Sequence, residues 1–134
     1  MTMTKFQALS LALALASSLS QAHADDLYIV ANPSPSVTPA DIREIFLGEK
    51  QFAGSVKIVP VDNSAAQADF LGKVMKMDTA KYNASWTKKT FRDGLNPPVL
   101  KSGDAEVLNY VKSTPGAIGY VVSKPSNVTV VQKY

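Results

Sequence analysis

Two residue types that carry much catalytic and metal chemistry are nearly missing from this sequence of 134 residues. It has no cysteine, and its single histidine is His23. The absence of cysteine excludes disulfides and thiol nucleophiles, so stability must come from an apolar core, for which the 46% apolar residues are ample. Without a further histidine, residues 25–134 cannot form a Ser-His-Asp triad or a histidine-based zinc site. No carboxylate pair is spaced for acid and base roles, so we predict a non-enzyme without metal or organic cofactor.

The excess of positive over negative charge is also small. The chain has 14 Lys+Arg against 11 Asp+Glu, a net charge of +3, and no basic run. Nucleic-acid binding by counterion release needs denser positive charge, so no nucleic-acid partner is predicted. The only arginines are Arg43 and Arg92, and either could hold an oxyanion with its planar fork. We expect Arg43 to face solvent and Arg92 to form a structural salt bridge, with Asp93 as one candidate.

The N-terminus has the pattern of a secretory signal peptide. Residues 1–24 contain one lysine, Lys5, then an apolar run too short to span a bilayer easily, and end with Ala22-His23-Ala24. Cleavage after Ala24 would leave residues 25–134 and, by removing Lys5, lower the net charge from +3 to +2. We therefore predict a protein exported to a bacterial periplasm, with no membrane insertion after cleavage.

Apolar periodicity in residues 25–134 predicts strands that alternate with helices. Strands are expected at residues 27–31, 56–61 and 117–122, with an edge strand at 128–131. Helices are expected after Thr38, after residues 62–67, at 79–91 and after Asp104, where Thr38 and Asp104 serve as N-caps. This order predicts one small α/β domain whose largely parallel sheet is flanked by helices.

Aromatic residues of the helix at 79–91 are expected to belong to the core. Tyr82, Trp86 and Phe91 fall near one side of that helix, and the lysines between them should point to water. A platform for stacking sugars would instead need aromatic residues clustered in loops.

Two loops follow predicted strands, where ligands of open α/β sheets bind. One is residues 32–36, which contains Ser34, and the other is DNSAAQ at residues 62–67. Small residues after Ser64 would let an anion approach the N–H groups of a helix N-terminus. The same letters also fit a capping box, in which Ser64 and Gln67 merely finish the helix. The local pattern leaves both interpretations open.

Three stretches resemble the phosphate-binding periplasmic proteins of ABC importers, especially their short, single-lobe relatives. They are DIREIFLGEK at residues 41–50, the strand-to-helix segment 59–70, and PGAIGYV at residues 115–121. The resemblance implies the fold of one lobe of a type II periplasmic binding protein. It also implies a solute-binding role connected with phosphate transport.

The middle stretch departs from the family pattern, in which an arginine followed shortly by D-G-S-G-T holds phosphate. Asp62 and Ser64 keep their places, but Asn63 replaces the first glycine, and Pro60 or Val61 occupies the arginine position. Two alanines replace G-T. The residues expected at an inherited anion site are Asn63, Ser64, Ala65, Ala66 and Gln67, with Ser34 from the other loop.

Two functions from different classes follow. The first is weak binding of phosphate or a similar oxyanion at the Ser64 helix, with a membrane transporter as possible partner. The second is a protein-interaction or sensory accessory module that kept the lobe and lost the ligand. In addition, two copies could pair as a homodimer and restore a cleft, or another chain could supply the second lobe.

Export can be tested by intact-mass measurement of the protein recovered from the periplasm. The expected mass is that of residues 25–134, because cleavage follows Ala24. Replacing Ala22 and Ala24 by leucine should leave the precursor uncut, since the peptidase requires small residues there. A full-length mass for the unaltered protein would contradict the prediction.

Overall fold

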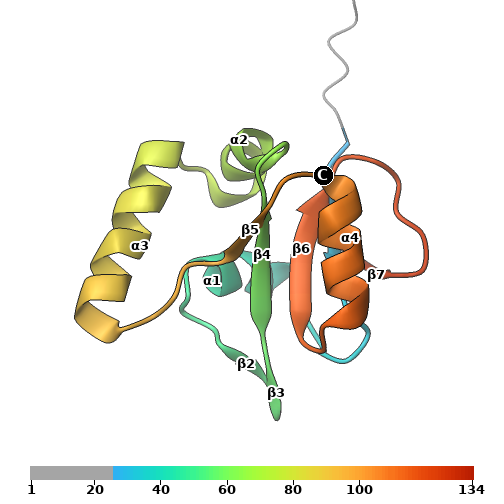
Figure 1. Cartoon of the computed structure of the whole chain (residues 1–134), viewed down its shortest axis with the longest axis horizontal. Coiled ribbons are helices and arrows are strands. Elements are labelled where there is room, and N and C mark those ends of the chain that lie inside the picture. Colours follow the sequence, from blue (N-terminus) through green and yellow to red (C-terminus); the bar gives the residue numbers. More distant parts are fainter. Residues whose placement is uncertain (1–25) are drawn as a thin grey trace, which may run out of the picture.

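The computed structural model describes residues 26–134, so the predicted signal peptide lies outside the described residues. Its centre is a five-stranded sheet in the order β5-β4-β6-β1-β7 (Figure 1). The strands are β1 (Tyr28–Ala31), β4 (Val59–Asn63), β5 (Val99–Lys101), β6 (Ala117–Val121) and β7 (Thr129–Lys133). A separate hairpin pairs β2 (Phe52–Ala53) with β3 (Val56–Lys57).

Strand directions confirm the predicted α/β fold with a largely parallel sheet. β4 pairs in parallel with both β5 and β6, whereas β1 pairs antiparallel with β6 and β7. Four of the five strands therefore point the same way, and β1 alone runs against them. As a result, the carboxyl ends of β4, β5 and β6 share one edge, at the top of Figure 1, and β1 ends at the opposite edge.

Helices cover both faces of the sheet. α4 (Asp104–Ser113) packs on one face, where Val107 and Val111 meet Val30, Val61 and Val121. The other face carries the larger core cluster, to which the remaining helices contribute. The contributing helices are α1 (Ile42–Phe46), α2 (Gln67–Phe70), the π-helical turn η2 (Leu71–Met75) and α3 (Thr79–Asp93), whereas the 3-10 turn η1 (Pro39–Asp41) has no buried residue.

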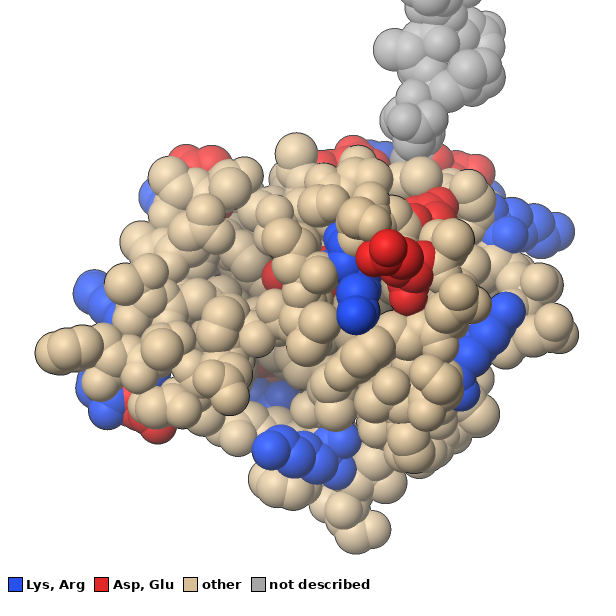
Figure 2. Space-filling view, in the orientation of Figure 1, with Lys and Arg blue, Asp and Glu red and all other residues tan. Residues whose placement is uncertain are grey.

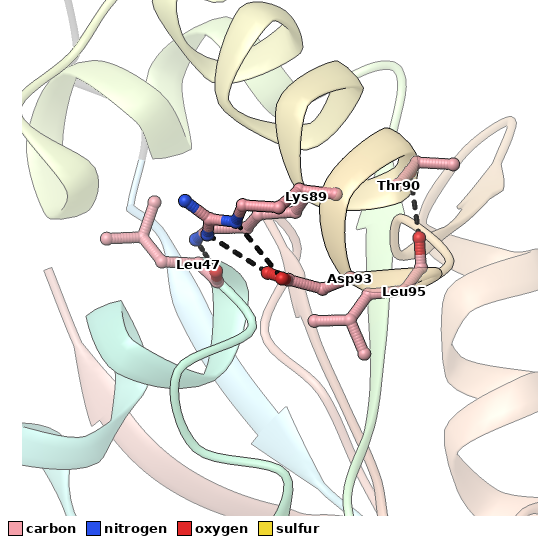
Figure 3. A network of polar contacts seen from close by, with 6 residues as sticks. Leu47, Lys89, Thr90, Asp93 and Leu95 are labelled. Atoms are coloured by element: carbon pink, nitrogen blue, oxygen red, sulfur yellow. Dashed lines mark hydrogen bonds and ion pairs between the residues drawn. The ribbon is translucent and has the colours of Figure 1, made fainter.

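α3 is joined to the rest of the protein by few side chains. Of its fifteen residues only Tyr82 and Trp86 are buried. The Trp86 indole N–H donates to the Phe46 carbonyl at 3.1 Å, and its ring lies against Gly48. Figure 3 shows the C-terminal end of α3, where the Lys89 ammonium donates to the Leu47 carbonyl. Beyond these contacts α3 stands off from the sheet at the left of Figure 1.

The prediction that Phe91 belongs to the apolar face of this helix is wrong. Tyr82 and Trp86 are four residues apart and share a face, but the five residues from Trp86 to Phe91 turn the helix about 140° away. Phe91 is accordingly 94% exposed. The predicted core positions Tyr82 and Trp86 are confirmed, with exposures of 2% and 6%.

Two further predictions are corrected by hydrogen bonds. The strand expected at residues 56–61 is divided, because Val56 closes a hairpin with Ala53 before β4 begins at Val59. Asp104 lies inside α4 and makes no cap bond. Its carboxylate instead accepts the backbone N–H groups of Val122 and Ser123, which fixes the chain after β6 to the start of α4.

Among the described residues, no helix has the length and apolar character needed to cross a bilayer.

Gly116 gives a test of this packing. Its φ of +82° is left-handed, and a Cβ there would fall on the Lys57 carbonyl oxygen, where the hairpin meets the start of β6. Gly54 has a similar φ of +61° with open space around it. We expect Gly54→Ala to lower the free energy of unfolding by about 1–2 kcal/mol and Gly116→Ala by clearly more, measured by urea unfolding. Equal losses would show that the close approach to Lys57 contributes nothing.

Candidate functional site

Asp62 lies at the carboxyl end of β4 and is only 3% exposed. It points to the face of the sheet that carries Tyr120 and α3. The hydroxyl of Tyr82 donates to one carboxylate oxygen at 2.7 Å, and the hydroxyl of Tyr120 donates to the other at 2.8 Å. The side chain thus links β4 to α3 through the hydrogen bond from Tyr82 and to the neighbouring strand β6 through the hydrogen bond from Tyr120.

Burial dominates the electrostatics of this group. It raises the pKa of the Asp62 carboxyl, and the two phenol hydrogen bonds offset only part of that rise. Burial, and then the neighbouring Asp62 charge, raise the pKa of both Tyr82 and Tyr120. The phenols therefore keep their protons far into the alkaline range.

Asn63 organises the turn that follows. Its amide nitrogen donates to Asp104 at 2.9 Å and to the Tyr120 carbonyl at 3.1 Å, and its amide oxygen accepts the Ala65 N–H at 3.1 Å. Asn63 is fully buried. A glycine at this place would provide none of these bonds, so the asparagine gives this loop its own internal network.

The N–H groups of the predicted anion site are largely occupied. The Ser64 N–H donates to the Lys101 carbonyl at 2.9 Å, the Ala65 N–H to the Asn63 side chain, and the Ala66 N–H to the Asn63 carbonyl at 3.0 Å. Ser64 and Ala65 are exposed, Gln67 is half-buried and Ala66 is buried. An anion at this turn would have to compete with these protein acceptors.

Of the two interpretations left open for residues 62–67, the capping box formed by Ser64 and Gln67 is wrong. The helix begins at Gln67, its N-cap is Ala66, and no side chain caps it. The turn closes through Asn63 instead, so the helix starts two residues later than Ser64 as N-cap would require. α2 itself has only four residues before the π-helical turn η2.

Ser34 does not join residues 63–67. Because β1 runs antiparallel to β6, the loop after β1 lies at the opposite edge of the sheet. There the Ser34 hydroxyl accepts the N–H of Gly116 at 2.8 Å, just before β6 starts. The prediction that the two loops share a binding edge is therefore wrong. It failed because the apolar run of β1 does not indicate in which direction the strand runs in the sheet.

A cleft of about 950 Å³ separates α3 from β4 and β5. Figure 2 shows this hollow between α3 and the central strands, with walls that are mostly free of charged groups. Residues of β4, α2, α3 and the segment into β5 line it: Asp62, Gln67, Tyr82, Asn83, Trp86, Thr87, Thr90, Phe91, Pro97, Pro98 and Leu100. Asp62 is the one acidic residue in this lining, which contains no Lys or Arg that could hold an oxyanion.

The two arginines lie where they were expected. Arg43 is exposed and its Nε donates to the Met75 carbonyl at 3.3 Å. Arg92 pairs with Asp93 through two hydrogen bonds of 3.0 Å. Within residues 26–134 no group of three or more potential metal ligands occurs.

Sequence reasoning missed this cleft. The spacing of Tyr82, Trp86 and Thr90 marks one face of α3, and Pro97-Pro98 marks an extended segment beside it. β5, with only three residues, gave no strand signal. Only the folded chain brings these parts together.

The fold is similar to part of known phosphate receptors. An ABC-type phosphate transport receptor from Vibrio cholerae matches 81% of this chain and 46% of its own length, at 16% identity and a TM-score of 0.50. PstS from Borrelia burgdorferi matches 72% of this chain and 40% of its own, at 19% identity and a TM-score of 0.48. No protein-family model matches the chain, and no curated protein is similar enough in sequence to count as a relative.

The fold is therefore an α/β domain that is similar to part of an ABC-type phosphate transport receptor. The chain spans less than half the length of the receptors it matches. At this level of identity the likeness concerns the fold alone. What the site binds must be argued from its own residues.

The buried phenols predict a defined alkaline behaviour. The fold raises the pKa values of Tyr82 and Tyr120. Between neutral pH and about pH 10 both phenols stay protonated in the folded and in the unfolded chain, so they leave the free energy of unfolding unchanged. Above about pH 10 they ionise in the unfolded chain only, which favours unfolding. Stability should fall steeply above about pH 10. In a spectrophotometric titration, Tyr82 and Tyr120 should ionise only when the protein unfolds. Tyr82→Phe should reduce the number of phenols that ionise on unfolding from two to one. Smooth titration of all five tyrosines in the folded protein would contradict this.

Proposed function

We propose that this protein is an exported, periplasmic solute-binding-type lobe that acts as a protein-interaction or sensory accessory module. One observation carries the proposal: the N–H groups of Ser64, Ala65 and Ala66 already have acceptors within the protein. A loop that forms its own hydrogen-bond network no longer offers an anion a ready set of donors.

The charges around the turn support the same conclusion. Oxyanion sites combine free backbone donors with Arg or Lys in a closed, desolvated cleft. Here the neighbouring cleft is lined by Asp62 and by no Lys or Arg, and both arginines point elsewhere.

Weak binding of phosphate or a similar oxyanion at residues 63–67, in support of a phosphate ABC transporter, is the second candidate. It is favoured by the likeness of the fold to a phosphate transport receptor and by the exposed side of Ser64 at the carboxyl edge of β4. The first N–H groups of a helix also lack intrahelical acceptors, so α2 could still offer donors beyond Ala66.

Thermal melting at constant ionic strength separates these functions. A ligand that binds only the folded state raises its stability by RT ln(1 + [L]/Kd), about 2.7 kcal/mol at 100 times Kd. We expect phosphate, sulfate and chloride to shift the melting temperature equally, as salts without a specific site. A phosphate-selective rise that is lost in Ser64→Glu/Gln67→Glu would contradict the interaction module and favour the anion site.

A further inference from the structure

We propose that the cleft between α3 and β5 is the docking site for a segment of a partner protein that inserts a lysine or arginine side chain toward Asp62 and covers the cleft rim with apolar side chains. The inference rests on the proposed interaction function. It adds the surface that is used and the chemistry of the partner.

Asp62 and Tyr82 are among the residues that line the cleft. Each Asp62 oxygen accepts one phenol proton, whereas a carboxylate has about four lone-pair sites. Tyr82 has given its only proton to Asp62, so its oxygen can now only accept. The group that complements these acceptors is a positively charged donor such as an ammonium or guanidinium.

The walls suit the same group. The rings of Tyr82 and Trp86 line the cleft, and cations bind favourably to aromatic faces. No Lys or Arg lines the cleft to repel a cation. Lys89, whose ammonium lies 5.4 Å from the centre of the Trp86 ring, donates to the carbonyl of Leu47, just after α1 (Figure 3). Charge complementarity therefore selects a basic group over an acidic one.

The rim indicates a protein segment rather than a small solute. Phe91 is 94% exposed and Leu100 is 59% exposed, and both border the cleft. A solute held against Asp62 would leave these side chains in water. A polypeptide that carries apolar residues beside its basic residue would cover them, in the way that interface anchors are buried by neighbouring contacts.

Three acetylated and amidated peptides test this proposal. They have the sequence Gly-Leu-X-Leu-Gly, with lysine, norleucine or glutamate at X, so that only the charge at the tip of one side chain changes. Backbone amide shifts of the labelled protein are followed during titration. We expect the lysine peptide to shift Asn83, Thr87 and Leu100, and to bind about tenfold more tightly than the norleucine peptide, with the glutamate peptide weakest.

Variants locate the site. Asp62→Asn keeps the shape and removes the charge, and should cost the lysine peptide its advantage over norleucine. Because Asp62 is buried, a second variant, Phe91→Ala, tests the site at an exposed position where the substitution leaves folding intact. It should lower the affinity for both the lysine and the norleucine peptide. Asp26→Asn is the matched control, since Asp26 pairs with Lys133 of β7, at the far edge of the sheet from β5.

Several results would overturn the docking site: equal affinity for the three peptides, shifts outside the cleft, or a Phe91→Ala variant that binds as well as the parent. A dimer of this chain, detected by sedimentation and accompanied by concentration-dependent amide shifts at the same cleft residues, would overturn it too. The proposed function fails separately, through a phosphate-selective rise in melting temperature. Peptide binding that does not depend on the lysine, without a phosphate-selective rise in melting temperature, would contradict the docking site and leave the proposed function in place.

Discussion

The buried carboxylate of Asp62 holds the α3 side of this protein together. Removing a carboxylate from water costs several kcal/mol unless hydrogen bonds replace the lost hydration, and here Tyr82 and Tyr120 supply them. Tyr120 is itself fixed by Phe70, whose ring stacks on it with centroids 4.0 Å apart. The phenol of Tyr82 brings α3 to the sheet, while Trp86 attaches the next turn to α1. The cleft exists because two anchors, rather than a full apolar face, hold a fifteen-residue helix.

Local pattern predicted elements that are long or strongly periodic. β1, β6, α3 and α4 lie close to their expected residues, because their apolar periods are clear. β5 and the β2–β3 hairpin are too short for a periodic signal. The direction of β1 was not predictable either, since an apolar run looks the same in parallel and antiparallel pairing. For the site, the DNSAAQ turn was found but its hydrogen bonds were not, because Asn63 finds its partners on α4 and β6, 41 and 57 residues away.

The turn after β4 shows that the fold of this chain does not by itself determine what its loops can bind. The turn after β4 lies where ligands of open α/β sheets bind. In this chain an asparagine stands at its centre, and the acceptors for its N–H groups come from within the protein. Fold and function therefore have to be argued separately, since the first rests on the packed sheet and the second on a few side chains at its edge.

The two ends of the described chain lie side by side. The Leu27 N–H donates to the Tyr134 carbonyl at 3.0 Å, and the Tyr134 N–H donates back to Leu27 at 2.8 Å. A longer polypeptide that contained this domain would enter and leave it at neighbouring positions on adjacent strands, about 5 Å apart. Such a domain can be inserted into a loop of another protein, or have its ends joined and be reopened elsewhere, with little strain on its sheet. The pairing of β1 with β7 thus makes the fold a transferable unit.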